Sequence, residues 1–177
     1  TILFSLRHIW DDTQPTLGTY GINLYINPDF FMSLTPNLRI SALAHESWHV
    51  AFKHMLRLGT KNPLIWNYAC DFYINLMLRK SGYEIDPKWC CDDKYNNMAV
   101  IDIYNQLMQD AEQNQQNGSS VGTPGSGLGS GKPDMQQPKD DSGKILPDDA
   151  AEAKINSTLV KAATAAKLSG HGSHIPD

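Results

Sequence analysis

The sequence has few cysteines and no long apolar run. Three of its 177 residues are cysteines, and two of them, Cys90 and Cys91, are adjacent. An odd count without the spacing of a disulfide framework favours a reducing compartment, so we expect a cytoplasmic protein. No apolar run approaches the roughly 18 residues that a membrane span needs. No signal peptide is seen at the start, although the chain does not begin with Met.

The sequence also lacks an excess of positive charge. It has 15 Lys and Arg against 19 Asp and Glu, which gives a net charge of −4 and a pI of about 5.8. No stripe of basic residues is present, and nucleic acid is therefore not an expected partner. The Cys90-Cys91 pair has no second pair with which to complete a four-sulfur metal site, so these residues are interpreted as packing or surface thiols.

The composition divides the chain into three parts. Residues 1–110 are rich in aromatic and aliphatic side chains and can form a core. Residues 111–149 include a low-complexity stretch rich in Gln, Asn, Gly and Ser, which is typical of a flexible linker or insertion. Residues 150–177 begin with an alanine-rich helical pattern that ends near Gly170. We expect this helix to dock on the core through Ile155, Leu159, Ala162 and Ala166.

The predicted fold class is α+β. Residues 19–27 alternate between apolar and other side chains, which predicts a strand. Residues 2–10 fit a strand or a helix equally well. Thr35-Pro36 and Asn62-Pro63 each pair an N-cap residue with proline at the first helical position. They predict two helices, which would end near Gly59 and Gly82.

The first of these helices carries a His-Glu-x-x-His pattern at His45, Glu46 and His49. Residues four apart on a helix lie about 40° apart around its axis, so both imidazoles share one face. Two histidines in that arrangement can bind one Zn²⁺ and leave room for further ligands. Glu46 would lie close enough to act as a general base on a metal-bound water. The pattern therefore suggests a zinc hydrolase.

The pattern fixes only three residues, and a surface helix with two solvated histidines would also produce it. The flanking residues favour a buried helix instead. Most of them are apolar: Leu38, Ala42, Leu43, Ala44, Val50, Ala51, Phe52, Met55 and Leu56. Because unpaired polar groups in a core cost several kcal/mol, a buried His-Glu-His group needs partners. A bound metal ion would satisfy it.

Asp71 is the best candidate for a third metal ligand. It lies with Asn67 and Asn75 at intervals of four residues, so the three form one polar stripe on a helix that is otherwise apolar. A buried carboxylate needs a charge partner or a metal. The asparagines would orient the ligands. The alternative is that Asp71 pairs with Arg39, Arg57 or a histidine without any metal.

His54 and His8 compete with Asp71 for the ligand role. His54 is five residues beyond His49 and would lie on the wrong face, unless the helix ended near Ala51. Nothing in the sequence around His8 favours it. His171 and His174 lie in a Gly-Ser tail and are expected to be solvated.

Together these segments resemble a family of metallopeptidase domains found in bacteria and phages, often followed by a von Willebrand factor A-like domain. The similar segments are residues 21–30, 43–54, 64–75 and 103–107. The resemblance implies a zincin-like fold, with His45, His49 and Asp71 as metal ligands and Glu46 as the catalytic base. It also implies a role for His54, because a histidine recurs there. By the same resemblance, the strand at 20–27 would align an extended peptide by main-chain pairing.

Family members usually continue beyond a Gly-x-x-x-Pro stretch that residues 172–176 resemble. The sequence is therefore expected to be a fragment or one domain of a longer protein. A von Willebrand factor A-like domain is an expected partner.

The expected function is zinc-dependent hydrolysis of peptide bonds in a protein or peptide substrate. Two alternatives remain. In the first, the chain is a catalytically silent zincin-like module that binds a protein, but such a module has no need of Glu46. In the second, the zinc site is purely structural, although such sites are usually closed by four ligands and rich in cysteine.

Overall fold

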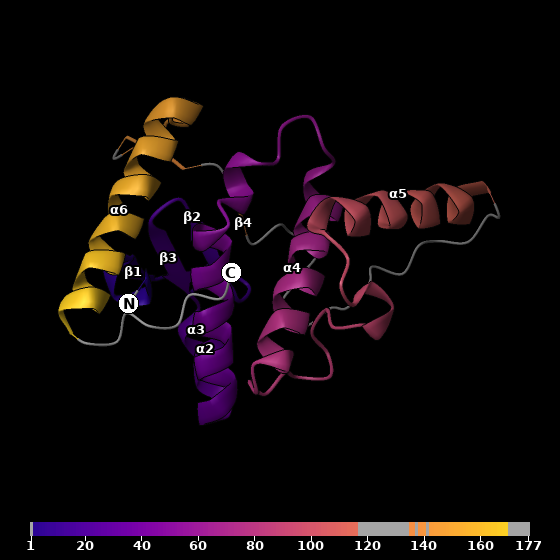
Figure 1. Ribbon diagram of the computed structural model, residues 1–177, viewed down its shortest axis with the longest axis horizontal. Coiled ribbons are helices and arrows are strands. Elements are labelled where there is room, and N and C mark those ends of the chain that lie inside the picture. The colour runs from indigo at the N-terminus through magenta and orange to yellow at the C-terminus, as the bar shows by residue number, and fades with distance from the viewer. Residues whose placement is uncertain (1, 117–134, 137, 141, 170–177) are drawn as a thin grey trace.

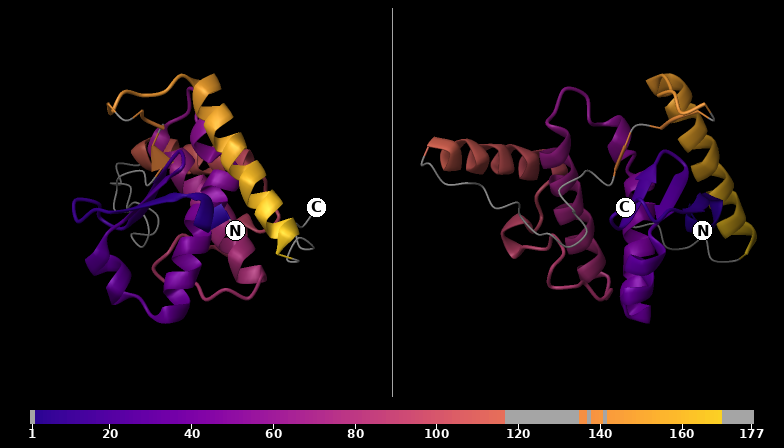
Figure 2. Two further views of the ribbon diagram at one scale, coloured as in Figure 1. Left: turned by 90° about the vertical axis from the view of Figure 1, so that its left-hand side faces the viewer. Right: turned by 180° about the vertical axis from the view of Figure 1, so that it is seen from behind.

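The fold places a small sheet between one long helix and a group of others (Figure 1). The computed structural model describes residues 2–116, 135–136, 138–140 and 142–169. In Figure 1 the sheet lies between α6 (Asp148–Leu168) and α3 (Pro36–Ala51). Beyond α3 come α4 (Pro63–Lys80) and then α5 (Val100–Gln116), which projects away from the other helices in the right-hand view of Figure 2. The predicted α+β class is confirmed.

Four short strands form the sheet in the order β1-β3-β2-β4. They are β1 (Arg7–Trp10), β2 (Leu17–Tyr20), β3 (Asn23–Ile26) and β4 (Met135–Gln136). Strand β3 runs parallel to β1 and antiparallel to β2, and β4 runs parallel to β2. The four-residue helix α1 (Ile2–Ser5) precedes β1, so residues 2–10 contain both a helix and a strand.

The prediction of one strand over residues 19–27 is wrong, because this segment is a hairpin. Tyr20 pairs with Asn23 across a two-residue turn. Gly21 has φ +69° and Ile22 does not have positive φ, as a type II′ turn requires. A Cβ at Gly21 would also lie 2.7 Å from Cβ of Pro138. The sequence pattern does not reveal this turn, because Ile22 continues the alternation of apolar residues from one strand into the next.

Helix α3 begins as predicted but ends earlier. The Thr35 hydroxyl accepts a hydrogen bond from the Leu38 N–H at 3.3 Å, and Pro36 is the first helical residue. The helix ends at Ala51 rather than near Gly59, because Lys53 adopts a left-handed conformation with φ 53°. Non-glycine residues rarely adopt this conformation. It turns the chain into the short helix η1 (His54–Leu56).

Helix α4 has both predicted ends. The Asn62 side chain accepts hydrogen bonds from the N–H groups of Leu64 and Ile65, and Pro63 is the first helical residue. The helix ends at Lys80, and Gly82 follows with φ +86°. The indole N–H of Trp66 donates to the His54 carbonyl at 3.0 Å. This bond fixes η1 against α4.

Two apolar clusters lie on opposite sides of the α3–α4 contact. One joins the sheet, α3 and α6: Leu6, Leu17, Leu24, Ile26, Leu34, Leu38, Ala42, Val50, Met55, Trp89 and Ile155. The other joins α4 and α5 with the short helix η2 (Asp93–Tyr95), and it also includes Met135. Helix α2 (Pro28–Ser33) connects the sheet to α3. The polar stripe of α4 lies between the two clusters.

The range predicted as a linker contains regular structure in its described parts. Helix α5 continues to Gln116, β4 joins the sheet at 135–136, and Lys139 bridges to Ile145. Residues 117–134, which hold most of the low-complexity stretch, lie outside the described residues. Helix α6 packs on α1 and buries Ala151, Ile155, Thr158 and Ala162.

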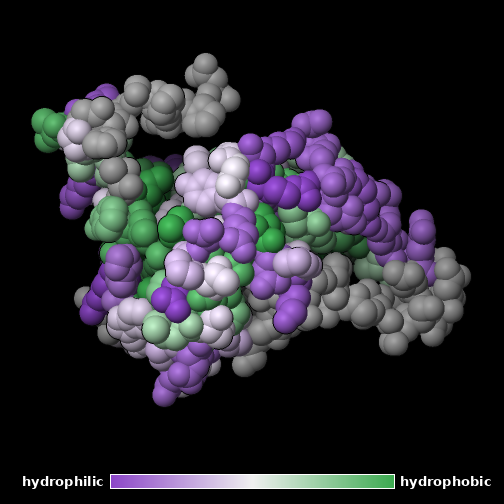
Figure 3. Space-filling model, turned by 90° about the horizontal axis from the view of Figure 1, so that it is seen from below, coloured by the Kyte–Doolittle hydropathy of each residue, from purple (hydrophilic) through white to green (hydrophobic). Residues whose placement is uncertain are grey.

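The exposed surface is mixed. From below, the side that carries α5 is mainly hydrophilic, and apolar side chains are exposed elsewhere on this face (Figure 3). Within the described residues, no helix combines the length and apolar character needed to cross a membrane.

Candidate metal centre

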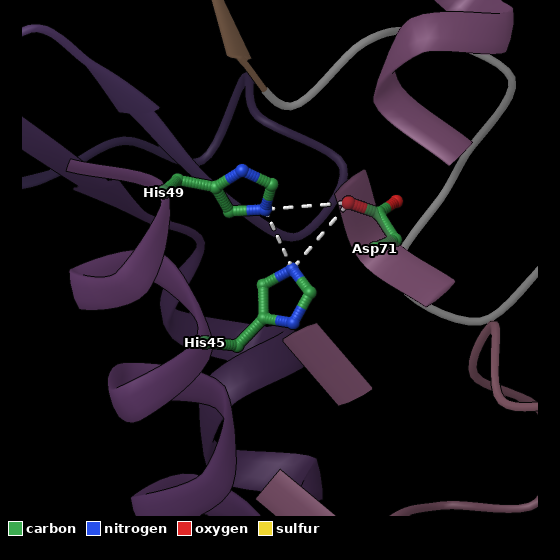
Figure 4. A group of neighbouring side chains, drawn as sticks. All are labelled: His45, His49 and Asp71. Carbon is green, nitrogen blue, oxygen red and sulfur yellow. Dashed lines mark hydrogen bonds and ion pairs between the residues drawn. The ribbon is translucent and has the colours of Figure 1, made fainter. Parts of the chain in front are cut away.

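Helix α3 turns two histidines toward α4. His45 and His49 are one helical turn apart and are fully buried. Their Nε2 atoms lie 2.8 Å apart, so the rings point to the same place (Figure 4). The early end of α3 does not disturb them, because both residues lie inside the regular helix.

Asp71 on α4 faces this pair of histidines. Its Oδ1 atom lies 3.3 Å from His49 Nε2 and 3.5 Å from His45 Nε2 (Figure 4). The carboxylate is fully buried, and Oδ1 has no hydrogen-bond partner of good geometry among the described residues. The three side chains each offer one ligand atom, and these atoms lie within 4.8 Å of one another. His45, His49 and Asp71 together are called the metal cluster.

Two asparagines of the α4 stripe contact the metal cluster. Asn67 donates from Nδ2 to Asp71 Oδ2 at 3.0 Å. Asn75 Oδ1 lies 2.8 Å from His45 Nδ1, while Asn75 Nδ2 donates to the Cys90 carbonyl at 3.1 Å. The contact with Cys90 fixes which side of the Asn75 amide faces His45. His45 therefore carries its proton on Nδ1, and its Nε2 is free to bind a cation.

Glu46 lies beside the metal cluster, and a residue of the sheet holds its side chain in place. The Thr19 hydroxyl on β2 donates to Glu46 Oε2 at 2.5 Å, and both residues are fully buried. The other carboxylate oxygen, Oε1, is buried without a hydrogen-bond partner within the described part of the chain. Sequence reasoning missed Thr19, because its contact with Glu46 spans 27 residues and no local pattern reports it.

His54 contacts His49 but is not a fourth member of the metal cluster. Because α3 ends at Ala51, η1 brings His54 Nδ1 to 3.2 Å from His49 Nδ1. This is the side of the His49 ring that faces away from Asp71. His54 is fully buried, and its Nε2 has no hydrogen-bond partner in the described residues.

The other histidines do not join the cluster. His8 is an exposed residue of β1, and its Nε2 lies 2.8 Å from the Leu3 carbonyl. His171 and His174 lie outside the described residues.

The electrostatics of the site favour a bound cation. Burial by itself lowers the pKa of His45, but the hydrogen bond and charge of Asp71, with the charge of Glu46, raise it above its ordinary value. Burial opposes ionisation of Asp71 too, yet hydrogen bonds and charges from His45 and His49 bring its pKa below the ordinary value. Two carboxylates facing two imidazoles attract positive charge, which a proton or a metal ion could supply.

Glu46 and His54 differ from the metal cluster in their acid–base behaviour. Burial raises the pKa of Glu46, although His49, His45 and Thr19 partly oppose the shift. Burial, with the nearby charges of His49 and Arg57, lowers the pKa of His54 well below its ordinary value. His54 is therefore neutral at physiological pH and can accept a hydrogen bond.

One further segment contacts the site from outside. The backbone N–H of Met135 on β4 donates to Asn67 Oδ1 at 3.3 Å. Met135 also pairs with Thr19 in the sheet. Sequence reasoning missed Met135, because it lies in the range predicted as a linker.

The fold and site together define an α+β protein with a buried His-His-Asp cluster that could hold a metal ion. The sequence profile of the family described as "Putative metallopeptidase domain" matches residues 1–174, and the chain belongs to this family. No curated protein and no solved structure is significantly similar to it.

Proposed function

We propose that this protein is a zinc-dependent peptidase, with the metal held by His45, His49 and Asp71 and with Glu46 as the general base. One observation carries the proposal. The ligand atoms of the metal cluster converge in a fully buried site, directly beside a carboxylate with one unpartnered oxygen. Three ligands leave a coordination position open, as catalytic zinc sites do.

The spacing of the ligand atoms fits zinc with a small adjustment. Bonds of about 2.0–2.2 Å at tetrahedral angles place ligand atoms roughly 3.3–3.6 Å apart. The Asp71 Oδ1 atom lies 3.3 and 3.5 Å from the two Nε2 atoms, which meets this spacing. The histidine nitrogens lie 2.8 Å apart and would have to separate by about half an ångström. A rotation of either ring about its side-chain bonds would suffice.

The protonation of the histidines also fits. A histidine that binds metal through Nε2 keeps its proton on Nδ1 and needs an acceptor there. Asn75 Oδ1 is that acceptor for His45, and His54 Nδ1 is placed to accept from His49. Zinc bound here would polarise a peptide carbonyl and make a water molecule more acidic.

The residues around the metal cluster would divide the remaining work. Glu46 would take a proton from the attacking water on Oε1, since Oε2 is held by Thr19, and would pass it to the leaving amine. Thr19 fixes the orientation of the carboxylate without touching the reacting atoms. The substrate would be a protein or peptide.

A cytoplasmic location and a von Willebrand factor A-like partner also remain proposals. Among the described residues, Cys70, Cys90 and Cys91 form no disulfide, which fits a reducing compartment.

The competing function is a catalytically silent module that binds a protein. The complete burial of the metal cluster is what such a module would also show. It would not require a buried carboxylate at Glu46, which is costly without a role. Purified protein loaded with zinc should therefore be assayed against a peptide library, with and without a zinc chelator. Metal-dependent cleavage supports the peptidase; stoichiometric zinc without any cleavage supports the silent module.

Replacing Thr19 by valine is expected to lower the rate of hydrolysis about tenfold without loss of metal. Valine keeps the shape of the side chain but removes the donor to Glu46 Oε2, which is a charge-assisted hydrogen bond. Thr158→Val is the matched control, because that buried hydroxyl bonds only within α6. Equal loss of rate in both variants would show a general effect of buried threonine hydroxyls and remove Thr19 from the site.

Replacing His54 by phenylalanine is expected to weaken zinc binding by about 10–100-fold, the usual effect of losing a partner of a ligating histidine. Phenylalanine fills the space but cannot accept from His49 Nδ1. His54→Asn, whose side-chain oxygen can replace Nδ1, should lose less affinity. Zinc affinities measured with a competing chelator would rank the variants, and a phenylalanine variant that binds like the wild type would refute the role.

A further inference from the structure

Strand β4 lies along the outer edge of β2 and contacts Asn67, which bonds to Asp71 of the metal cluster. We propose that β4 is an internal strap: Met135–Gln136 occupy the edge of the sheet at which an extended peptide substrate would pair, and the site opens when they leave. The inference rests on the proposed peptidase function. It explains why every member of the metal cluster is fully buried although a substrate must reach it.

The register of the sheet points the side chain of Met135 toward the site. Paired residues of neighbouring strands place their side chains on the same face. Met135 pairs with Thr19, whose side chain contacts Glu46 on α3. The next pair confirms the alternation, because Gln136 Nε2 donates to the Tyr20 hydroxyl at 3.2 Å on the opposite face. Met135 therefore lies on the face that carries the metal cluster, and it is only 8% exposed.

The backbone of β4 also connects the two walls of the site. On one side Met135 pairs with Thr19, the residue that holds Glu46. On the other side its N–H donates to Asn67 Oδ1, and Asn67 in turn donates to Asp71. A peptide chain in this position thus lies between the element that carries the proposed base and the element that carries the third metal ligand. A substrate backbone would need the same position.

The pairing of β4 with β2 is weak enough to open. Strand β4 consists of two residues, and Gln136 is exposed. Met135 and Gln136 also form part of the wall of a cavity of about 440 Å³, with Met55, Leu58 and Trp66 among the other lining residues. Because one side of β4 faces this open space, it lacks the packing of an inner strand. Segments with few buried contacts open at a low free-energy cost.

A closed site lowers apparent affinity in a predictable way. A ligand that binds only the open form has its apparent dissociation constant raised by the inverse of the open fraction. Weakening β4 should therefore tighten binding of any small metal-directed ligand. No change in the metal ligands themselves is needed.

The test compares Met135→Pro with the wild type after both are loaded with Co²⁺, and titrates acetohydroxamic acid by the visible spectrum of the metal. Proline lacks the N–H that reaches Asn67 and disfavours strand pairing. Met135→Ala is a second, milder variant that keeps the backbone. Leu107→Ala is the matched control, because Leu107 is similarly buried, at 7% exposure, in the same apolar cluster but on α5.

We expect the hydroxamate to bind Met135→Pro at least about tenfold more tightly than wild type, with Met135→Ala in between and Leu107→Ala unchanged. The release of Co²⁺ to EDTA should accelerate in the same order. Equal hydroxamate affinity in all four proteins would overturn the strap. No uptake of Co²⁺ by any of them would overturn the metal centre as well. Tighter hydroxamate binding without cleavage of any peptide would support the strap and count against the peptidase.

Discussion

Replacing Glu46 by glutamine is expected to lower peptide hydrolysis by about 10²–10⁴-fold, the usual contribution of a general base. Glutamine keeps the length of the side chain and an oxygen for the Thr19 hydroxyl. It cannot take up a proton from water. The zinc content should remain that of the wild type, because the metal cluster does not include Glu46. Metal analysis and initial rates on the same preparations would measure both effects.

The stability of this variant provides an independent check. Burial raises the pKa of Glu46, so ionisation of this carboxylate lowers the stability of the folded protein. The neutral amide removes that cost, and the melting temperature is expected not to fall. Glu152→Gln is the matched control, because Glu152 is an exposed residue paired with Lys53. Turnover at the wild-type rate in Glu46→Gln would remove Glu46 from the mechanism.

Replacing Asp71 by alanine is expected to weaken zinc binding by at least about 100-fold. Structural zinc sites bind with roughly 10–16 kcal/mol, so one ligand contributes about 3 kcal/mol. The change also leaves the Asn67 amide without its acceptor. Asp71→Asn preserves the shape of the side chain but removes its negative charge, so this variant should also lose affinity for zinc. Both variants would lose hydrolysis together with metal.

The matched control for Asp71 is Asp102→Ala, since Asp102 is an exposed carboxylate on α5. Zinc content after dialysis and affinity against a competing chelator would separate the two positions. If Asp71→Ala kept its zinc, Asp71 would not be the third ligand, and His54, which contacts His49, would be the first alternative to test. That outcome would leave the metal site in place but reassign its geometry.

Local sequence reasoning succeeded where a regular helix made it sufficient. The 3.6-residue period brought His45 and His49 to one face, and the same period lined up Asn67, Asp71 and Asn75 on α4. Thr35 and Asn62 capped their helices as predicted, because a cap acts within a few residues. Membership of the metallopeptidase family was also recognised from these segments.

Local sequence reasoning failed where a single residue changed the direction of the chain. Gly21 divides the predicted strand into a hairpin, and Lys53 ends α3 eight residues before Gly59, the predicted stop. The second difference decides the role of His54. In a continuous helix His54 would face away from His49, whereas after the left-handed turn at Lys53 the two Nδ1 atoms lie 3.2 Å apart.

The sequence by itself determined that His45 and His49 share one helix face and that Asp71 lies in a polar stripe on a second helix, because helical spacing is a local property. Only the tertiary structure decided that Asp71 faces the two histidines, that Thr19 bonds to Glu46, that His54 contacts His49, and that the Met135 N–H bonds to Asn67. These contacts join residues from different elements, and no periodicity connects such elements in advance. Their packing therefore decides how the site is supported.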